Sequence, residues 1–192
     1  QTGTSVYRDF VELPSQIMEN WATEKEFLDL WAVNYQTGEP IPAEIVERII
    51  AAQNYLAAYL NVRQLSFGLT DMAWHTITEP FEGDVEQFEV ASMAPSQVQP
   101  VVPGTAMAPA FGHIFSGGYA AGYYGYKWAE VLEADAFSLF KEKGIFNREV
   151  SGSFRENILS KGGTEHPMEL YVRFRGHKPE TKALIEKMGL GK

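Results

Sequence analysis

The fold class is decided by residues 42–77, PAEIVERIIAAQNYLAAYLNVRQLSFGLTDMAWHTI. Apolar side chains recur there every three or four positions, which is the spacing that gathers them on one face of an α-helix. Pro42 suits the first turn of a helix, because an N–H at that position would have no partner within the helix. The stretch therefore predicts a long helical region from Pro42 to about Ile77, with Gly68 as a candidate interruption.

Further helices are expected on both sides of this stretch. Upstream, residues 5–23 and 24–35 read as helical, and Thr37-Gly-Glu-Pro40 ends the second of them. Downstream, helices are expected over residues 84–93, 119–143, 147–160, 167–175 and 179–188. The proline-rich residues 94–110 predict an irregular loop, and Ser116-Gly117-Gly118 predicts a break before residue 119. Because no stretch alternates with the period of a strand, the sequence predicts a mainly α, multi-helical chain.

The amino-acid composition argues against several classes of binding partner. The 192 residues are 45% hydrophobic, carry a formal net charge of −9 and contain no cysteine. Nucleic acid is not an expected partner, because Lys and Arg form no basic cluster that would bind phosphates. No membrane segment is expected either, since no apolar run reaches the ~20 residues of a bilayer span. The absence of cysteine excludes disulfides and thiolate metal sites.

One stretch is unusually rich in groups that carry chemistry: residues 111–128, FGHIFSGGYAAGYYGYKW, contain four tyrosines and five glycines. On the expected helix, Tyr119, Tyr123 and Tyr126 are spaced i, i+4, i+7 and share one face. Phenolic hydroxyls beside His113 can donate hydrogen bonds to a carbonyl oxygen as it becomes an oxyanion. The same pattern is typical of an aromatic stripe packed in a core, with glycines admitting a neighbouring helix, and the pattern alone leaves both interpretations open.

A second stretch, residues 9–21, groups carboxylates. Asp9, Glu12 and Glu19 fall near one face of the expected helix. Carboxylates grouped in this way can bind a metal or orient its ligands. They are more typical of a solvated acidic face, and the pattern alone favours that interpretation.

Taken together, these stretches resemble the thimet-oligopeptidase and neurolysin family of zinc metallopeptidases. Residues 3–4 and 8–21 resemble the family segment that follows its H-E-x-x-H zinc helix, and His113–Tyr126 resembles the family's substrate-binding His/Tyr loop. The six-residue step from His113 to Tyr119 is similar to that of the bacterial peptidyl-dipeptidase branch. Residues 154–176 are similar to the end of the family's chains.

The resemblance implies that residues 1–192 are a single helical segment, the C-terminal portion of a zincin-type catalytic domain that hydrolyses short peptides. It implies that Glu12 is the third protein ligand of zinc in the intact enzyme. It also implies that Tyr119 and Tyr126 are the phenols that reach the scissile region, at least one of them stabilising the oxyanion.

Substrate binding and ligand orientation follow from the same resemblance. His113 and, more weakly, Tyr123 are implied to contact the substrate. Asp9 lies one turn before Glu12, and from that position we expect it to orient a zinc-bound histidine.

The zinc helix itself is not in this sequence. None of the four histidines lies four residues from another; they are His75, His113, His166 and His177. We therefore expect zinc in the intact enzyme but none in this chain, which would be an inactive fragment lacking its N-terminal part as a partner. The fragment is expected to expose an apolar face and to self-associate through it. The alternative is a non-catalytic helical module that binds a peptide or a partner through the Tyr119–Tyr126 face.

Two properties stay open at this level. Pro103-Gly-Thr-Ala-Met-Ala-Pro109 stands where related bacterial peptidyl-dipeptidases have arginines, so removal of C-terminal dipeptides and internal cleavage are both possible outcomes. The compartment, cytoplasm or periplasm, is also undetermined, because the chain begins at Gln1 and shows no targeting segment.

Overall fold

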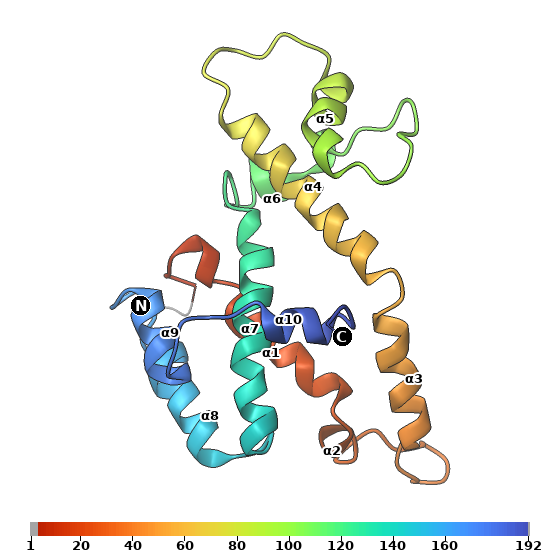
Figure 1. Cartoon of the computed structure of the whole chain (residues 1–192), viewed down its shortest axis with the longest axis vertical. Coiled ribbons are helices and arrows are strands. Elements are labelled where there is room, and N and C mark those ends of the chain that lie inside the picture. The colour runs from red at the N-terminus through yellow and green to blue at the C-terminus, as the bar shows by residue number, and fades with distance from the viewer. Residues whose placement is uncertain (1–3, 192) are drawn as a thin grey trace. The chain divides into compact units, whose positions relative to one another are not determined.

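The structure, a computed structural model, describes residues 4–191 and is mainly α (Figure 1). Within these residues there are ten α-helices and no β-strand, apart from an isolated antiparallel bridge between Val33 and Pro40. The predicted fold class is therefore confirmed. Within the same range, no helix is both long enough and apolar enough to cross a bilayer.

The helices of the described residues have the following bounds: α1 (Leu13–Glu19), α2 (Lys25–Leu28), α3 (Ala43–Gln53), α4 (Ala57–His75), α5 (Val85–Met93), α6 (Gly112–Phe115), α7 (Tyr124–Lys143), α8 (Arg148–Phe154), α9 (Pro167–Arg175) and α10 (Lys182–Lys187). Short 3₁₀ turns join them: η1 (Arg8–Phe10), η2 (Asn20–Thr23), η3 (Ala94–Ser96) and η4 (Ala108–Ala110). A π-helical turn, η5 (Arg155–Leu159), continues α8.

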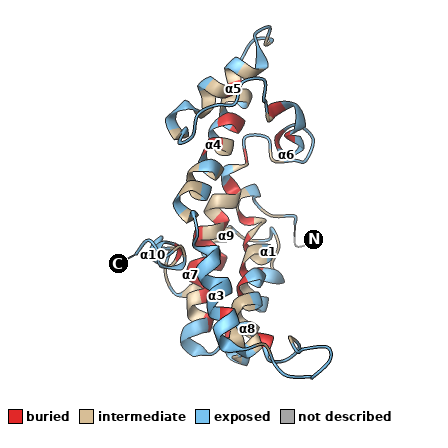
Figure 2. Ribbon diagram, turned by 90° about the vertical axis from the view of Figure 1, so that its right-hand side faces the viewer, coloured by how far each residue is buried: buried red, intermediate tan, exposed pale blue. Residues whose placement is uncertain are grey.

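The chain divides into two compact units: a split unit, residues 1–57 with 128–192, and a middle unit, residues 58–127. The split unit contains the main hydrophobic core, built where α1, α7, α8 and α9 pack together (Figure 2). Ile17, Leu170 and Tyr171 are fully buried in it. Each such side chain contributes about 1.5–3 kcal/mol relative to an exposed one, so these helices are held mainly by apolar burial.

Two buried carboxylates of α7 tie the split unit together. The Glu133 carboxylate accepts hydrogen bonds from Asn20 Nδ2 and Lys187 Nζ, both at 2.6 Å. Asp135 Oδ2 accepts the hydroxyl of Tyr171 at 2.6 Å. Burial raises the pKa of the Glu133 carboxyl, and burial beside Asp135 raises the pKa of Tyr171. Each carboxylate thus joins α7 to a segment distant in sequence.

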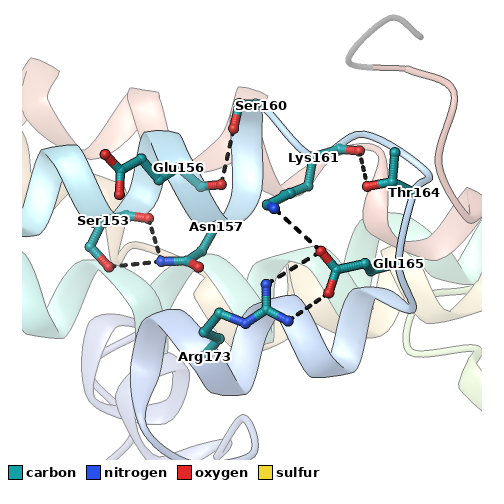
Figure 3. A network of polar contacts seen from close by, with 8 residues as sticks. All are labelled: Ser153, Glu156, Asn157, Ser160, Lys161, Thr164, Glu165 and Arg173. Carbon is teal, nitrogen blue, oxygen red and sulfur yellow. Dashed lines mark hydrogen bonds and ion pairs between the residues drawn. The ribbon is translucent and has the colours of Figure 1, made fainter.

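Polar contacts also fix the turn between α8 and α9 (Figure 3). The Glu165 carboxylate accepts hydrogen bonds from Arg173, with the shorter at 2.5 Å, and pairs with Lys161 at 3.4 Å. Across η5, Asn157 Nδ2 donates to the Ser153 carbonyl at 3.0 Å. The Asn157 bond satisfies the Ser153 carbonyl at the junction with the π-helical turn, and the Glu165 contacts hold the turn that follows it to α9.

The observed helix boundaries differ from the predicted ones at several places. The helix predicted over 42–77 is broken at residues 54–56, where Leu56 has φ of 57°, and not at Gly68. The segment predicted as helical over 24–35 forms only the short α2. Residues 5–23 are helical in three pieces, and the helix predicted from residue 119 begins at Tyr124. Two of these differences change the description of the candidate site: the start of this last helix, and the division of residues 5–23, which contain Asp9 and Glu12.

Candidate functional site

The turn between α6 and α7, in the middle unit, is made by two glycines. After α6 the chain folds back, so that Gly117 N–H donates to the Gly112 carbonyl at 2.7 Å and Tyr119 N–H to the His113 carbonyl at 3.0 Å. A Cβ at Gly117 would lie 2.9 Å from His113 Cα, and Gly118 has φ of 82°. Both positions therefore need glycine, one for space and one for conformation. The turn brings Tyr119 back towards His113.

The predicted histidine and tyrosine side chains gather at this turn. The His113 ring lies 6.1 Å from the rings of Tyr119 and Tyr126, measured between centroids. Tyr119 and Tyr126 stack at 5.0 Å, and Tyr123 lies 5.0 Å from Tyr126. Tyr119 precedes α7 and is not on its helical face. The four residues nevertheless form one group, which we call the His/Tyr cluster.

Exposure differs across the His/Tyr cluster. His113 is exposed, whereas Tyr119 and Tyr126 are partly buried. Tyr123 turns towards α4: its hydroxyl donates to Gln64 Oε1 at 3.2 Å, and its ring packs against Phe67. Burial, with a smaller contribution from Tyr126, raises the pKa of Tyr123. Tyr123 thus anchors the cluster to α4.

The backbone of the cluster is hydrogen-bonded to a buried carboxylate that the sequence analysis did not identify. Asp71 on α4 is fully buried; its Oδ1 accepts Ala121 N–H at 2.9 Å and its Oδ2 accepts Tyr123 N–H at 2.8 Å. His75 Nδ1 lies 2.8 Å from Asp71 Oδ1. The available signal was an aspartate among apolar residues of a helix, a position where a buried charge needs partners.

A second buried carboxylate, Glu89 on α5, holds the loop that leads to η4. It accepts the N–H groups of Met107 at 2.8 Å and Ala108 at 2.6 Å. Beside it lies a cavity of about 330 Å³, lined by residues that include Arg63, Phe67 and Gln97. Two residues of the predicted irregular loop, Met107 and Ala108, are thus held by a side chain of α5.

Glu12 and Asp9 lie in the split unit, before α1, and do not share the face of one helix as predicted. Glu12 is the residue preceding α1 and is partly buried, and its Oε2 accepts the Ser15 hydroxyl at 2.6 Å. Asp9 lies in η1 and lines a cavity of about 200 Å³ together with Trp128 and His166. Gly3, which belongs to residues 3–4 of the family resemblance, lies outside the described residues.

The described residues do not contain a complete metal site. A partly buried carboxylate oriented by a hydroxyl, as at Glu12, suits one ligand position of a zinc ion. Over residues 4–191, however, no three His, Cys, Asp or Glu side chains are grouped so that they could hold a metal ion. Glu12 can therefore be at most one ligand among several.

The comparisons with known proteins point to one family. The model of Peptidase family M3 matches residues 1–190. Oligopeptidase A of Escherichia coli strain K12 is 50% identical over 185 residues, which are 95% of this chain and 27% of that protein. The probable cytosolic oligopeptidase A of Arabidopsis thaliana is 41% identical over 187 residues, again 95% of this chain and 27% of the relative.

A relative with a different name matches as well. Dipeptidyl carboxypeptidase of Escherichia coli strain K12 is 38% identical over 191 residues, 98% of this chain and 28% of that protein. Among these relatives, identity is thus higher to the oligopeptidase A sequences than to the dipeptidyl carboxypeptidase. The chain spans just over a quarter of the length of each.

Proposed function

Because this chain belongs to peptidase family M3, we propose that it is the part of a zinc-dependent oligopeptidase that presents phenol and imidazole groups to the peptide bond being cleaved. The observation that carries the proposal is the His/Tyr cluster, in which three tyrosine rings and one imidazole lie within 6.1 Å of a neighbour. Its hydrogen-bond donors match the needs of acyl transfer, whose transition state develops negative charge on the carbonyl oxygen.

Within the cluster we assign different roles by exposure. Tyr119 and Tyr126, stacked and partly buried, donate hydrogen bonds to the developing oxyanion, where a desolvated donor is worth most. His113 is exposed and binds the substrate main chain. Tyr123, whose hydroxyl is bonded to Gln64, contributes its ring to the wall of the binding surface.

We also propose that Glu12 is one ligand of zinc in the complete enzyme, with the other ligands supplied by residues outside this sequence. The hydroxyl of Ser15 would orient the carboxylate for that purpose. Zinc, when bound, supplies Lewis-acid chemistry at the scissile carbonyl. Asp9, three residues before Glu12, is proposed to orient a neighbouring ligand.

Two exposed apolar faces support a proposal about the rest of the protein. On α4, Leu65, Leu69 and Met72 are 50%, 40% and 42% exposed, at i, i+4, i+7 spacing. On α3, Ile45 and Ile49 are similarly exposed. Since the chain spans just over a quarter of its relatives' length, we propose that these faces contact the remaining part of the complete enzyme.

The catalytic proposal is tested in a chimera in which this chain replaces the matching segment of Escherichia coli oligopeptidase A. For Tyr119→Phe and for Tyr126→Phe we expect kcat on a short fluorogenic peptide to fall by roughly 10²–10³-fold for at least one of them, with the far-UV spectrum unchanged. The matched control is Tyr124→Phe, a half-exposed tyrosine at the start of α7, which should retain kcat. Parental kcat in both variants would refute the role of the cluster.

The same chimera distinguishes the two cleavage modes named among the relatives. A peptide with a blocked C-terminal carboxylate is a substrate for internal cleavage but not for an enzyme that must bind that carboxylate to remove a dipeptide. We expect the blocked peptide to be cleaved, because the loop before the cluster, residues 103–109, carries no arginine that would anchor a carboxylate. Cleavage confined to the unblocked peptide would contradict this.

A further inference from the structure

Asp71 connects α4 to the backbone that carries the catalytic tyrosines. Its two carboxylate oxygens accept two different N–H groups, those of Ala121 and Tyr123, and both groups lie between Tyr119 and Tyr126. The Asp71 side chain is fully buried, so it supports the backbone of this segment from the protein side and does not reach the substrate.

The segment needs such a fixed point. Ala121 has φ of 50°, a left-handed conformation that residues other than glycine rarely adopt. Tyr123 directly precedes α7, where backbone N–H groups have no partner within the helix. One carboxylate therefore stabilises an unfavourable backbone conformation and caps a helix N-terminus, where negative charge is also favoured by the helix dipole.

We propose that Asp71 is a positioning residue for catalysis: by holding Ala121 and Tyr123 it sets the distance between Tyr119 and Tyr126. The proposal rests on the proposed function of those two tyrosines and adds the residue through which they are placed. His75 Nδ1 lies 2.8 Å from the Asp71 carbonyl oxygen and 2.8 Å from Asp71 Oδ1, so it contacts the residue at both atoms. Asp71 acts through the tyrosines and has no contact with the reacting atoms.

A matched control exists in the same unit. Glu89 is also a buried carboxylate that accepts two backbone N–H groups, but those groups belong to Met107 and Ala108, ahead of the cluster. Replacing either carboxylate by its amide turns one acceptor oxygen into a donor beside a backbone N–H. The change is milder at Glu89, because Met107 N–H lies 2.8 Å from both of its oxygens and can still be accepted by the oxygen that remains. A general loss of stability should therefore appear in both variants, and a loss of catalysis only in one.

The experiment uses the chimera described above. For Asp71→Asn we expect kcat to fall about 10–100-fold with KM within about 3-fold, as for displaced transition-state donors. Glu89→Gln should keep kcat within about 3-fold while lowering Tm. Exchange of the Tyr123 amide hydrogen should become faster in Asp71→Asn, which reports the lost bond independently of activity.

Two double variants test whether the effect passes through the tyrosines. In a Tyr119→Phe or Tyr126→Phe background that is already slowed, adding Asp71→Asn should cost less than about 3-fold, because groups acting as a unit are not additive. Adding Ala121→Gly to Asp71→Asn should restore part of kcat, since glycine adopts the left-handed conformation unaided.

The outcomes separate the two proposals. If the tyrosine variants lose activity but Asp71→Asn keeps kcat, or if Glu89→Gln loses as much, the positioning role is overturned. If neither tyrosine variant loses activity, the proposed function fails and the positioning role with it. Should Asp71→Asn not fold, Ala121→Val strains the same backbone from an exposed position, and parental kcat in that variant would likewise overturn the proposal.

Discussion

Glu133 shows at the scale of one residue how burial and pairing compete. Only 1% of it is exposed, and burial raises the pKa of its carboxyl even though Lys187 and Asn20 donate hydrogen bonds that act in the opposite direction. A raised pKa means that the folded state binds the proton more tightly than the unfolded state. Its contribution to stability is therefore fully present below the unfolded-state pKa of about 4.5 and is lost as pH rises through the folded pKa.

This predicts a pH dependence that one substitution removes. Relative to Glu133→Gln, the parent chain should lose free energy of unfolding as pH rises from about 4.5 towards 7. The reason is that the Glu133 carboxyl of the parent ionises in this range, whereas the glutamine side chain does not. Urea unfolding of both proteins at several pH values in this range measures the difference. A difference that is constant, or that grows in favour of the parent, would contradict the prediction.

The candidate site was predictable from sequence only where chemistry is local. His113, Tyr119, Tyr123 and Tyr126 lie within fourteen residues, and the structure brings their rings together. Asp71 could not be found in this way, because its partners are backbone N–H groups fifty residues further along the chain. The roles of these residues, and those of Glu12 and Asp9, stay predictions until the variants are measured.

At the scale of elements, helices with local end signals were the predictable ones. The helix predicted over 84–93 is observed as α5, where Asp84 Oδ1 accepts Gln87 N–H at 2.9 Å, and α9 begins at Pro167 and ends before Gly176 as predicted. The segment before Tyr124 is held instead by Asp71, about fifty residues away, and the break at Leu56 carries no glycine or proline that would signal it. Gly68, the candidate interruption, lies inside α4, because a single glycine costs a helix only about 1 kcal/mol.

Two glycines in the same unit should respond to alanine in opposite directions. A Cβ at Gly163 would lie 2.3 Å from the Ser5 carbonyl oxygen, a backbone atom that cannot move without shifting its segment. We expect Gly163→Ala to lower the free energy of unfolding by about 1–3 kcal/mol. A Cβ at Gly152, inside α8, meets nothing within 4 Å, so Gly152→Ala should raise it by about 0.5–1 kcal/mol.

Denaturant unfolding of the two variants checks the pair. Because both changes add one methyl group, a general effect of the added volume would give the same sign in both. Tolerance of Gly163→Ala would show that the close approach of residues 5 and 163 does not hold in solution. Destabilisation by Gly152→Ala would show that the space beside Gly152 is not free.

At the scale of the whole molecule, the exposed apolar faces predict self-association of the isolated chain. Leu65, Leu69 and Met72 form a stripe along α4 that no described side chain of the middle unit buries. We expect size-exclusion chromatography with light scattering to show a mass above the 21.5 kDa of one chain, increasing with concentration. A charge within the stripe, Leu69→Glu, should shift the distribution towards the monomer.

The control for this prediction is Val102→Glu, which places the same charge on an exposed loop residue outside the stripe. It should leave the mass distribution unchanged. A strictly monomeric parent chain, or an equal response to both substitutions, would show that the α4 stripe is not the surface of association.

The dependence of the His/Tyr cluster on Asp71 limits what can be transplanted. Residues 111–126 carry the reactive side chains, but the shape of their backbone is borrowed from α4. If that short loop alone were grafted onto another protein, the aromatic rings would be transferred without the Asp71 carboxylate that holds their backbone. A transplant must therefore include at least the loop, α4 and the Asp71 carboxylate between them, all of which lie in the middle unit apart from Ala57.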